Sequence, residues 1–395
     1  MITGNAVIGQ SGGPTSVINA SLCGVVQECL KLGNIERILG MRYGIEGFME
    51  GALIDLGAQK RSVIEALRTT PGSALGSCRH KVKDNDFDAI LTMLKKHNIR
   101  YFFLIGGNDT MDTVHRVETR CRAAGYELVG VGIPKTVDND LFGTDHTPGY
   151  GSAARYVALS VKQAGVLARD MKRVDQYVIF QTVGRDAGWL AAASALAKED
   201  EADAPHIILV PERKFDRGKF LGDVKTCHDR YGWVSIVCGE GIAYADGTPV
   251  SAGATADKFS NVEFGAMGGA SAAMMLHKMI AVEFGWRGEF QVCESLQMCA
   301  ADRVSPTDAE EAYACGVRAV QLAVEGGSGV MVSIVRESDE PYRWSLGTAP
   351  LPDVAVRAKP MPDAYINAEG NFVTPEFIKY VAPLVGPLPS YARLP

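Results

Sequence analysis

Residues 101–110 read Tyr-Phe-Phe-Leu-Ile-Gly-Gly-Asn-Asp-Thr, a strand-like apolar run that ends in a glycine pair and polar side chains. The same order recurs at residues 128–140, where a second apolar run leads into Pro-Lys-Thr-Val-Asp-Asn-Asp. A third run, Ala6–Ile8, leads into a glycine-rich turn at residues 9–14. Strand, glycine turn and helix in alternation are typical of mostly parallel sheets covered by helices. Because ligands bind at the carboxyl ends of such strands, these segments predict a binding site.

Further periodic segments extend this arrangement along the chain. Strand-like runs also occur at Tyr177–Thr182, His206–Val210 and Trp233–Cys238. Apolar residues at helical spacing predict helices at Val17–Leu30, Asp86–His97, Gly151–Leu167 and Trp189–Lys198. We therefore expect an α/β fold with two Rossmann-like open sheets, helices on both faces of each sheet, and an active site in the cleft between the two lobes.

Length and composition support two lobes, since 395 residues with 47% apolar content can bury large cores. We expect one lobe to comprise residues 1–147, completed by part of residues 298–340, and the other to comprise residues 148–297. Residues 341–395 form a C-terminal extension that packs on the lobes or at a subunit contact. The prolines of this extension exclude long helices, apart from a short one near Pro375–Tyr380.

Charge and cysteine usage exclude several classes of protein. The formal net charge of −6 argues against nonspecific nucleic-acid binding, which needs a basic surface. No apolar run reaches the length of about eighteen residues that a membrane span needs, and no targeting segment is visible. The nine cysteines lack C-x-x-C pairs, and the seven histidines, among them His146, lack metal-ligand spacing. We expect a soluble, cytoplasmic protein with reduced thiols and locally hydrogen-bonded histidines.

The polar residues after the apolar runs suit phosphoryl transfer. Asp138 and Asp140 point the same way from an extended segment and repel each other, which leaves one carboxylate able to accept a proton. Lys135 is placed to neutralise phosphate charge as it develops. Asn108 and Asp109 fit a metal site, although taken alone these residue types more often belong to a turn or helix cap.

The turn at residues 9–14 would place free N–H groups at the start of a helix, where anions bind. Its sequence is Gly-Gln-Ser-Gly-Gly-Pro, which matches neither the Walker A pattern nor the dinucleotide fingerprint. A phosphate-binding turn and a purely structural strand-to-helix turn therefore both remain open.

From Ala6 to about Ala323 the chain resembles the phosphofructokinases, and within them the pyrophosphate-dependent branch. Each matching motif is short, but their order along the chain is specific. The motifs are Gly12-Gly13-Pro14 with Asn19, Gly76–Arg79, Gly106–Thr110, Pro134–Asp140, Val183–Arg185 and Gly239–Gly241.

The resemblance implies a role for each matching position. Asp138 resembles the general base that takes the proton of the 1-hydroxyl of fructose 6-phosphate, and Asn108 stands where other members have a magnesium-associated carboxylate. The first lobe would bind the phosphate donor and the second the sugar phosphate. The implied donor contacts are Gly12, Gly13 and Arg79, and the implied sugar contacts are Thr136, Val137, Asp138, Asp140, Val183, Gly184, Arg185 and Glu240.

Two positions indicate the donor. By this resemblance, family members that use ATP have small residues at the positions of Asp109 and Lys135. A carboxylate at position 109 would repel the α-phosphate of ATP, whereas Lys135 would compensate charge on the shorter pyrophosphate. The resemblance implies a glycolytic enzyme that transfers a phosphoryl group reversibly, with Mg²⁺, from pyrophosphate to fructose 6-phosphate. An ATP-dependent phosphofructokinase and a non-catalytic sugar-phosphate-binding paralogue remain alternatives.

One stretch departs from the family pattern. Family members have His or Tyr, two further residues and then Arg where this chain has Ser295-Leu-Gln-Met298, so cationic contacts to the sugar phosphate are missing. Arg287, Arg303 or an arginine of a neighbouring subunit could replace them, and the family implies a homodimer or homotetramer. The sequence leaves open whether sedoheptulose 7-phosphate is also accepted, which effectors act, and in which direction the reaction runs in the cell.

Overall fold

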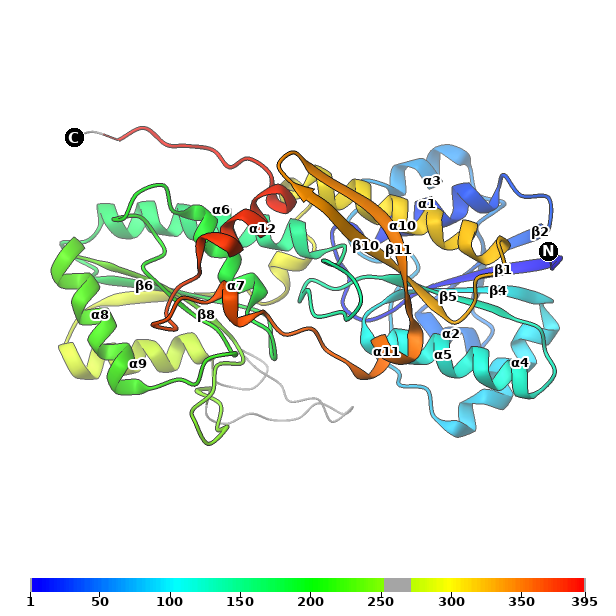
Figure 1. Ribbon diagram of the computed structural model, residues 1–395, viewed down its shortest axis with the longest axis horizontal. Coiled ribbons are helices and arrows are strands. Elements are labelled where there is room, and N and C mark those ends of the chain that lie inside the picture. The colour runs from blue at the N-terminus through cyan, green and yellow to red at the C-terminus, as the bar shows by residue number, and fades with distance from the viewer. Residues whose placement is uncertain (1, 252–270, 394–395) are drawn as a thin grey trace. The chain divides into compact units, whose positions relative to one another are not determined.

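The computed structural model describes residues 2–251 and 271–393 (Figure 1). The chain divides into two compact units, each built from two stretches of sequence. Unit 1 comprises Met1–Ser152 and Met298–Lys359, and unit 2 comprises Ala153–Gln297 and Pro360–Pro395. Of the C-terminal residues 341–395, the part up to Lys359 belongs to unit 1 and the part from Pro360 belongs to unit 2.

Unit 1 contains a seven-stranded sheet in the order β11-β10-β5-β4-β1-β2-β3. Neighbouring strands are parallel except for the pairs β2–β3 and β10–β11, which are antiparallel. The strands are β1 (Gly4–Gln10), β2 (Ile35–Met41), β3 (Leu53–Asp55), β4 (Ile99–Gly106), β5 (Val129–Pro134), β10 (Val330–Asp339) and β11 (Tyr342–Pro350). The predicted strands β1, β4 and β5 are confirmed and lie side by side at the centre of the sheet.

Helices cover both faces of this sheet, as predicted (Figure 1). They are α1 (Ile18–Cys29), α2 (Gly44–Met49), α3 (Arg61–Leu67), α4 (Phe87–Lys96), α5 (Asn108–Ala123), α10 (Pro306–Val324) and α11 (Leu351–Val356). Alternate residues of β1 point into the hydrophobic cores on the two faces of the sheet. Ala6 and Ile8 pack with α1 and α10, whereas Val7 packs with α4 and α5. Helices α1 and α10 approach closely, because a Cβ on Gly24 would lie 2.3 Å from the carbonyl oxygen of Tyr313.

Unit 2 contains a parallel four-stranded sheet in the order β7-β8-β6-β9. Its strands are β6 (Tyr177–Thr182), β7 (Ile207–Leu209), β8 (Val234–Gly239) and β9 (Gly288–Val292). Its helices are α6 (Tyr150–Asp170), which starts in unit 1, α7 (Trp189–Ala193), α8 (Arg217–Tyr231), α9 (Ala272–Phe284) and α12 (Pro375–Val385). Short 3₁₀ helices in the two units span Asp84–Asp86, Ser194–Ala197, Glu294–Met298, Ala301–Arg303 and Asp363–Tyr365.

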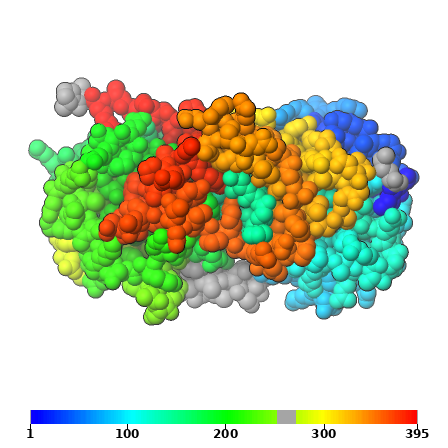
Figure 2. Space-filling view, viewed as in Figure 1, coloured from blue at the N-terminus to red at the C-terminus, as the bar shows by residue number. Residues whose placement is uncertain are grey.

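Two predicted helices differ in extent from those observed. The pattern at Trp189–Lys198 is α-helical only as far as Ala193 and continues as a 3₁₀ helix. Helix α12 is longer than predicted, since Pro375 occupies its first turn and Pro383 lies close to its end, where few backbone hydrogen bonds are lost. Its aromatic side chains pack on α7, with the Trp189 and Tyr380 ring centroids 5.4 Å apart, and the segment after it lies on the surface (Figure 2).

Within residues 2–251 and 271–393, no helix combines the length and the apolar character that a membrane crossing requires. All nine cysteines lie in this part of the chain, where none of them forms a disulfide.

Candidate active site

The three glycine-containing segments meet at one edge of the unit 1 sheet, as predicted. Gln10 at the end of β1 pairs with Ile105 of β4, and Gly106 of β4 pairs with Pro134 of β5. Hydrogen bonds continue beyond the strands, from the Ser11 N–H to the Ile105 carbonyl (3.0 Å) and from the Lys135 N–H to the Gly106 carbonyl (3.1 Å). The parallel sheet therefore places the ends of β1, β4 and β5 together.

The side chain of Lys135 joins two of these segments. It is 4% exposed, and its Nζ donates a hydrogen bond to the Gly13 carbonyl oxygen at 2.7 Å. A Cβ on Gly12 would lie 3.2 Å from the same Nζ, and Gly12 has a left-handed φ of 74° that favours glycine. Burial lowers the pKa of Lys135 to about 8, although the nearby carboxylates of Asp138 and Asp140 oppose the shift. A desolvated ammonium group thus lies against the glycine turn.

A loop ending in Arg79 is bound to the glycine turn. The Gly12 N–H donates to the Cys78 carbonyl (3.1 Å), and the Ser77 hydroxyl donates to the Gly12 carbonyl (2.6 Å). The buried Gln10 side chain accepts hydrogen bonds from the Ser73 hydroxyl and the Leu75 N–H, which holds the same loop from below. Arg79 itself is exposed at the end of this anchored loop.

Two of the N–H groups at the start of the first helix, where we expected free donors to an anion, are already hydrogen-bonded. Helix α1 begins only at Ile18, and the Thr15 hydroxyl oxygen already accepts from the N–H groups of Val17 (3.3 Å) and Ile18 (3.0 Å). The residues between the turn and the helix carry this local cap, so an anion in unit 1 would meet the glycine turn rather than the end of α1.

Asn108 and Asp109 form the first turn of α5. The N-cap position is Gly107, so neither side chain occupies the cap that was one alternative for these residues. The Asp109 carboxylate is 72% exposed and lies 3.2 Å from the Lys81 ammonium nitrogen. The Asn108 Nδ2 donates to the Arg357 carbonyl at 3.5 Å, whereas its Oδ1 is buried without a hydrogen-bond partner in the described part of the chain.

The side chains at this edge of the sheet can hold a metal ion only together with a bound phosphate compound. No group of three or more His, Cys, Asp or Glu side chains that could hold a metal occurs among residues 2–251 and 271–393. The orphaned Asn108 Oδ1 is a suitable oxygen ligand for a hard cation, but a single amide binds weakly. Most ligands of a divalent cation here would therefore have to come from a bound phosphate compound.

The segment Thr136–Asp140 follows β5 and is held by hydrogen bonds within the segment and by hydrogen bonds to residues 147 and 148. The Thr136 hydroxyl accepts from the Asp138 N–H (3.1 Å), and the Thr136 N–H donates to the Pro148 carbonyl (3.3 Å). Asn139 is fully buried with a φ of 57°, and its Oδ1 accepts from the Thr147 N–H (3.1 Å). Val137 is buried, whereas Asp138 and Asp140 are half-buried.

A second constellation lies at the carboxyl ends of β6 and β8 in unit 2. The Gly184 N–H donates to the Glu240 carboxylate (3.3 Å), and the Glu240 N–H donates to the Thr182 carbonyl (3.1 Å). Gly184 has a φ of 123°, and a Cβ on Gly241 would lie 1.7 Å from the Arg185 carbonyl oxygen. These glycines let the turn after β6, which begins with Val183, pack against the turn after β8.

The electrostatics of this second constellation are mainly acidic. Burial raises the pKa of Glu240 to about 7, and the carboxylates of Glu294 and Asp186 add to the shift. The Gly184 N–H and the exposed Arg185 act in the opposite direction. At neutral pH the Glu240 carboxyl group can therefore both donate and accept a hydrogen bond.

The structure separates the residues considered for the missing cationic contacts. The Arg287 guanidinium pairs with Asp175 at 2.8 Å, at the amino ends of β6 and β9, while Glu240 follows the carboxyl end of β8. Gln176 binds the backbone of Arg287 at this same end. A six-residue strand such as β6 spans about 20 Å, so Arg287 does not reach Glu240 within one chain.

Met298 and its neighbours lie elsewhere. The methyl carbon of Met298 lies only 2.3 Å from where a Cβ on Gly13 would be, so in unit 1 this side chain packs against the glycine turn. Ser295 is exposed in unit 2, and Arg303 is a largely buried side chain beside Asp302 in unit 1. The packing of Met298 was not predicted, because it joins residues that are far apart in sequence.

Comparisons with known proteins show which sequences and structures this chain resembles. The sequence model of the family described as phosphofructokinase matches residues 5–323. A pyrophosphate–fructose 6-phosphate 1-phosphotransferase of Xanthomonas campestris is 41% identical over 392 residues, which cover 98% of this chain and 92% of the relative. The enzyme of the same name from Halomonas elongata is 39% identical and covers 96% of this chain and 91% of the relative. A solved pyrophosphate-dependent phosphofructokinase of Nitrosospira multiformis superposes with a TM-score of 0.89 at 38% identity, covering 98% of this chain and 94% of that structure.

Proposed function

Because the chain belongs to the phosphofructokinase family, we propose that it transfers a phosphoryl group reversibly from pyrophosphate to the 1-hydroxyl of fructose 6-phosphate. The products are fructose 1,6-bisphosphate and phosphate. The observation that carries the donor assignment is the buried Lys135, whose ammonium group lies against the Gly13 carbonyl in the glycine turn at residues 9–14. Pyrophosphate can bind this ammonium group through its phosphate oxygens and needs no nucleoside to do so.

Asp138 is the proposed general base. It accepts the proton of the 1-hydroxyl while that oxygen attacks the terminal phosphorus of pyrophosphate, and phosphate leaves. The Thr136 hydroxyl, bonded to the Asp138 N–H, fixes the backbone that carries this carboxylate. Lys135, Arg79 and the turn at Gly12 stabilise the charge that develops on the diphosphate.

We propose that Mg²⁺ enters with pyrophosphate and that Asn108 Oδ1 is its ligand from the protein, since this oxygen is buried and lacks another partner in the described residues. When bound, the cation would neutralise part of the negative charge on the phosphate oxygens, and Asn108 would help to hold it there. Asp109 at the first turn of α5 acts on donor choice by repelling a longer polyphosphate.

In unit 2, Glu240 with Val183, Gly184 and Arg185 binds the hydroxyl groups and the phosphate of the sugar. The main support is the buried Glu240 carboxyl group, which can exchange hydrogen bonds with a sugar hydroxyl. Arg287 is too far from Glu240 in its own chain, so a sugar-phosphate contact from this arginine requires a second subunit in a homodimer or homotetramer. Sedimentation of the purified protein, compared with that of Arg287→Glu, tests this assembly. The proposed setting is cytoplasmic glycolysis.

The experiment is a paired assay with fructose 6-phosphate and magnesium. Phosphate release is followed with pyrophosphate, and ADP formation is followed with ATP at the same concentration. Pyrophosphate should be used and ATP should not, and Asp138→Asn should abolish turnover while fructose 6-phosphate still binds by calorimetry. The double variant Asp109→Gly, Lys135→Gly should gain ATP use. Preference for ATP in the unaltered protein would overturn the donor assignment, and sugar binding without turnover would favour a non-catalytic paralogue.

A further inference from the structure

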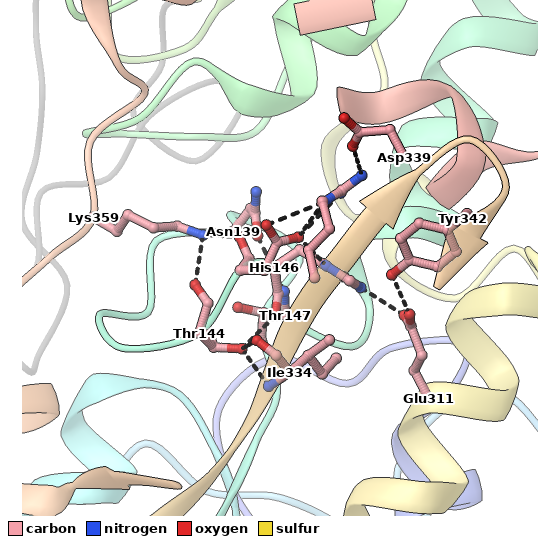
Figure 3. Close-up of polar contacts among 11 residues, drawn as sticks. Asn139, Thr144, His146, Thr147, Glu311, Ile334, Asp339, Tyr342 and Lys359 are labelled. Atoms are coloured by element: carbon pink, nitrogen blue, oxygen red, sulfur yellow. Dashed lines mark hydrogen bonds and ion pairs between the residues drawn. The ribbon is translucent and has the colours of Figure 1, made fainter. Parts of the chain in front are cut away.

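The segment that follows the catalytic carboxylates contains a buried histidine between two acids (Figure 3). His146 is 1% exposed. Its Nδ1 lies 2.7 Å from the Asp145 Oδ2 and its Nε2 lies 2.6 Å from the Glu311 Oε2, so both ring nitrogens face carboxylate oxygens. An imidazole with both nitrogens facing acceptors is satisfied only when both carry hydrogen, which is the imidazolium form. The acids accordingly raise the pKa of His146 despite its burial.

Groups from the last part of unit 1 complete this cluster. The Tyr342 hydroxyl of β11 donates to the Glu311 Oε1 at 2.6 Å (Figure 3). The Arg336 guanidinium of β10 contacts Asp145 at 3.0 Å and Asp339 at 3.0 Å. The Lys359 Nζ donates to the carbonyl oxygens of Asp145 (2.6 Å) and Thr144 (3.2 Å). We call these residues the His146 cluster: Asp145, His146, Glu311, Arg336, Asp339, Tyr342 and Lys359.

The charges of the His146 cluster balance only when the histidine is protonated. The three negative charges of Asp145, Glu311 and Asp339 then equal the three positive charges of His146, Arg336 and Lys359, of which His146 and Arg336 contact carboxylates and Lys359 contacts backbone carbonyl oxygens. Burial without the partner charge is costly for each of these groups, so removing one cation leaves a carboxylate uncompensated. The contacts with two ionised groups hold the pKa of Asp145 at about 2, well below its usual range.

The His146 cluster is connected to the proposed base through the backbone. Thr147, the next residue, donates its N–H to the Asn139 Oδ1, and Asn139 directly follows Asp138. The Pro148 carbonyl accepts from the Thr136 N–H, and Asn139 has a left-handed φ of 57°, which asparagine tolerates better than most residues with a side chain. The Lys359 N–H also donates to the Asp140 carbonyl at 2.7 Å. Both ends of the segment 136–140 therefore rest on residues that the cluster fixes.

We propose that His146, clamped between Asp145 and Glu311, is a positioning residue that holds Asp138 in the orientation for proton transfer. This inference rests on the proposed function. The match to the family model ends at residue 323. The members of the His146 cluster that come from the hairpin β10–β11, together with Lys359, therefore lie outside the matched part of the chain.

The test compares His146→Gln with the double variant His146→Gln, Glu311→Gln. The single variant leaves Asp145 and Glu311 without a cation between them, and kcat should fall at least about tenfold because small displacements of a catalytic group are costly. The KM values for pyrophosphate and fructose 6-phosphate should change less than about threefold, since the binding groups stay in place. The double variant pairs two neutral amides and should recover much of the lost kcat.

His206→Gln is the matched control, because His206 is a largely buried histidine of unit 2 whose Nδ1 accepts from the Ser235 N–H at 2.9 Å. It should lower Tm and leave kcat unchanged. If His146→Gln does not fold, Tyr342→Phe removes only the hydroxyl donor to Glu311 and should lower kcat a few-fold. An unchanged kcat in folded His146→Gln or in Tyr342→Phe, or a rise of KM alone, would overturn the proposal. Failure of the proposed function is seen separately, as absence of pyrophosphate turnover in the unaltered protein.

Discussion

Replacing Lys135 should separate the stability of this protein from its activity. Burial lowers the pKa of Lys135 from 10.5 to about 8. At neutral pH the ammonium group stays charged in the folded state. A difference in pKa of roughly 2.5 then lowers the free energy of unfolding by about 3 kcal/mol. Lys135→Met removes this loss, together with a hydrogen bond to the Gly13 carbonyl that contributes about 1–2 kcal/mol. We therefore expect the variant to be more stable by about 1–2 kcal/mol at pH 7.

The pH dependence follows from the direction of the shift. A lysine with a lowered pKa in the folded state destabilises the protein fully below about pH 8, and this effect disappears as the pH rises toward 10.5. Thermal unfolding should show a Tm for Lys135→Met that is a few degrees higher at pH 7, with the gain lost near pH 10. Pyrophosphate turnover should be abolished at every pH, because the charge on the diphosphate is no longer neutralised.

The kinetics of the unaltered enzyme give a second test of the same group. The value of kcat/KM for pyrophosphate should fall above about pH 8, since it reports the free enzyme. Lys135→Arg keeps a permanent charge and should lack this fall, so the difference between the two profiles separates Lys135 from the ionisation of pyrophosphate. The control is Lys198→Met, which removes a half-buried lysine of unit 2 and should keep the original profile. A lower Tm for Lys135→Met at pH 7, or a flat kcat/KM profile from pH 7 to pH 9.5, would refute the reasoning.

Three further outcomes are expected. Since burial raises the pKa of Glu240 to about 7, stability is lost as the pH rises from about 4.5 to 7, and Glu240→Gln should have a higher Tm than the unaltered protein at pH 8 but no gain at pH 4.5. Gly241→Ala would place a Cβ 1.7 Å from the Arg185 carbonyl oxygen and should destabilise unit 2 by about 2 kcal/mol or more in denaturant titrations, whereas Gly222→Ala, in open space on α8, should stabilise it slightly. Asn108→Asp adds a carboxylate ligand and should lower the magnesium concentration for half-maximal turnover several-fold; an unchanged magnesium titration would contradict a metal at this position.

Strands that are buried on both faces were predictable, because a parallel sheet covered by helices makes them continuous apolar runs. All six predicted strands are present, among them β4 and β5 at the centre of unit 1. Strands β2, β3 and β9 were missed, as were β10 and β11. Their burial is only partial, and the hairpin between them turns at Glu340 and Pro341 without an Asn-Gly or Asp-Gly signal.

The candidate site was predictable only in part. Glycines, carboxylates and a lysine directly after neighbouring parallel strands have to share an edge of the sheet, and the hydrogen bond from Lys135 to Gly13 agrees with that placement. The packing of Met298 on Gly13 and the orphaned Asn108 oxygen were not predictable, because both depend on segments that sequence patterns do not bring together.

The sequence by itself determined the α/β class, the positions of the central strands along the chain and the chemical groups at their ends, because these depend on local periodicity and on residue type. Only the tertiary structure decided the ionisation of those groups. His146 was expected to be an ordinary hydrogen-bonded histidine, but Glu311, 165 residues away in sequence, lies 2.6 Å from its ring and favours the imidazolium. A pKa depends on burial and on charges within a few ångströms, and these neighbours are established only when distant segments pack together.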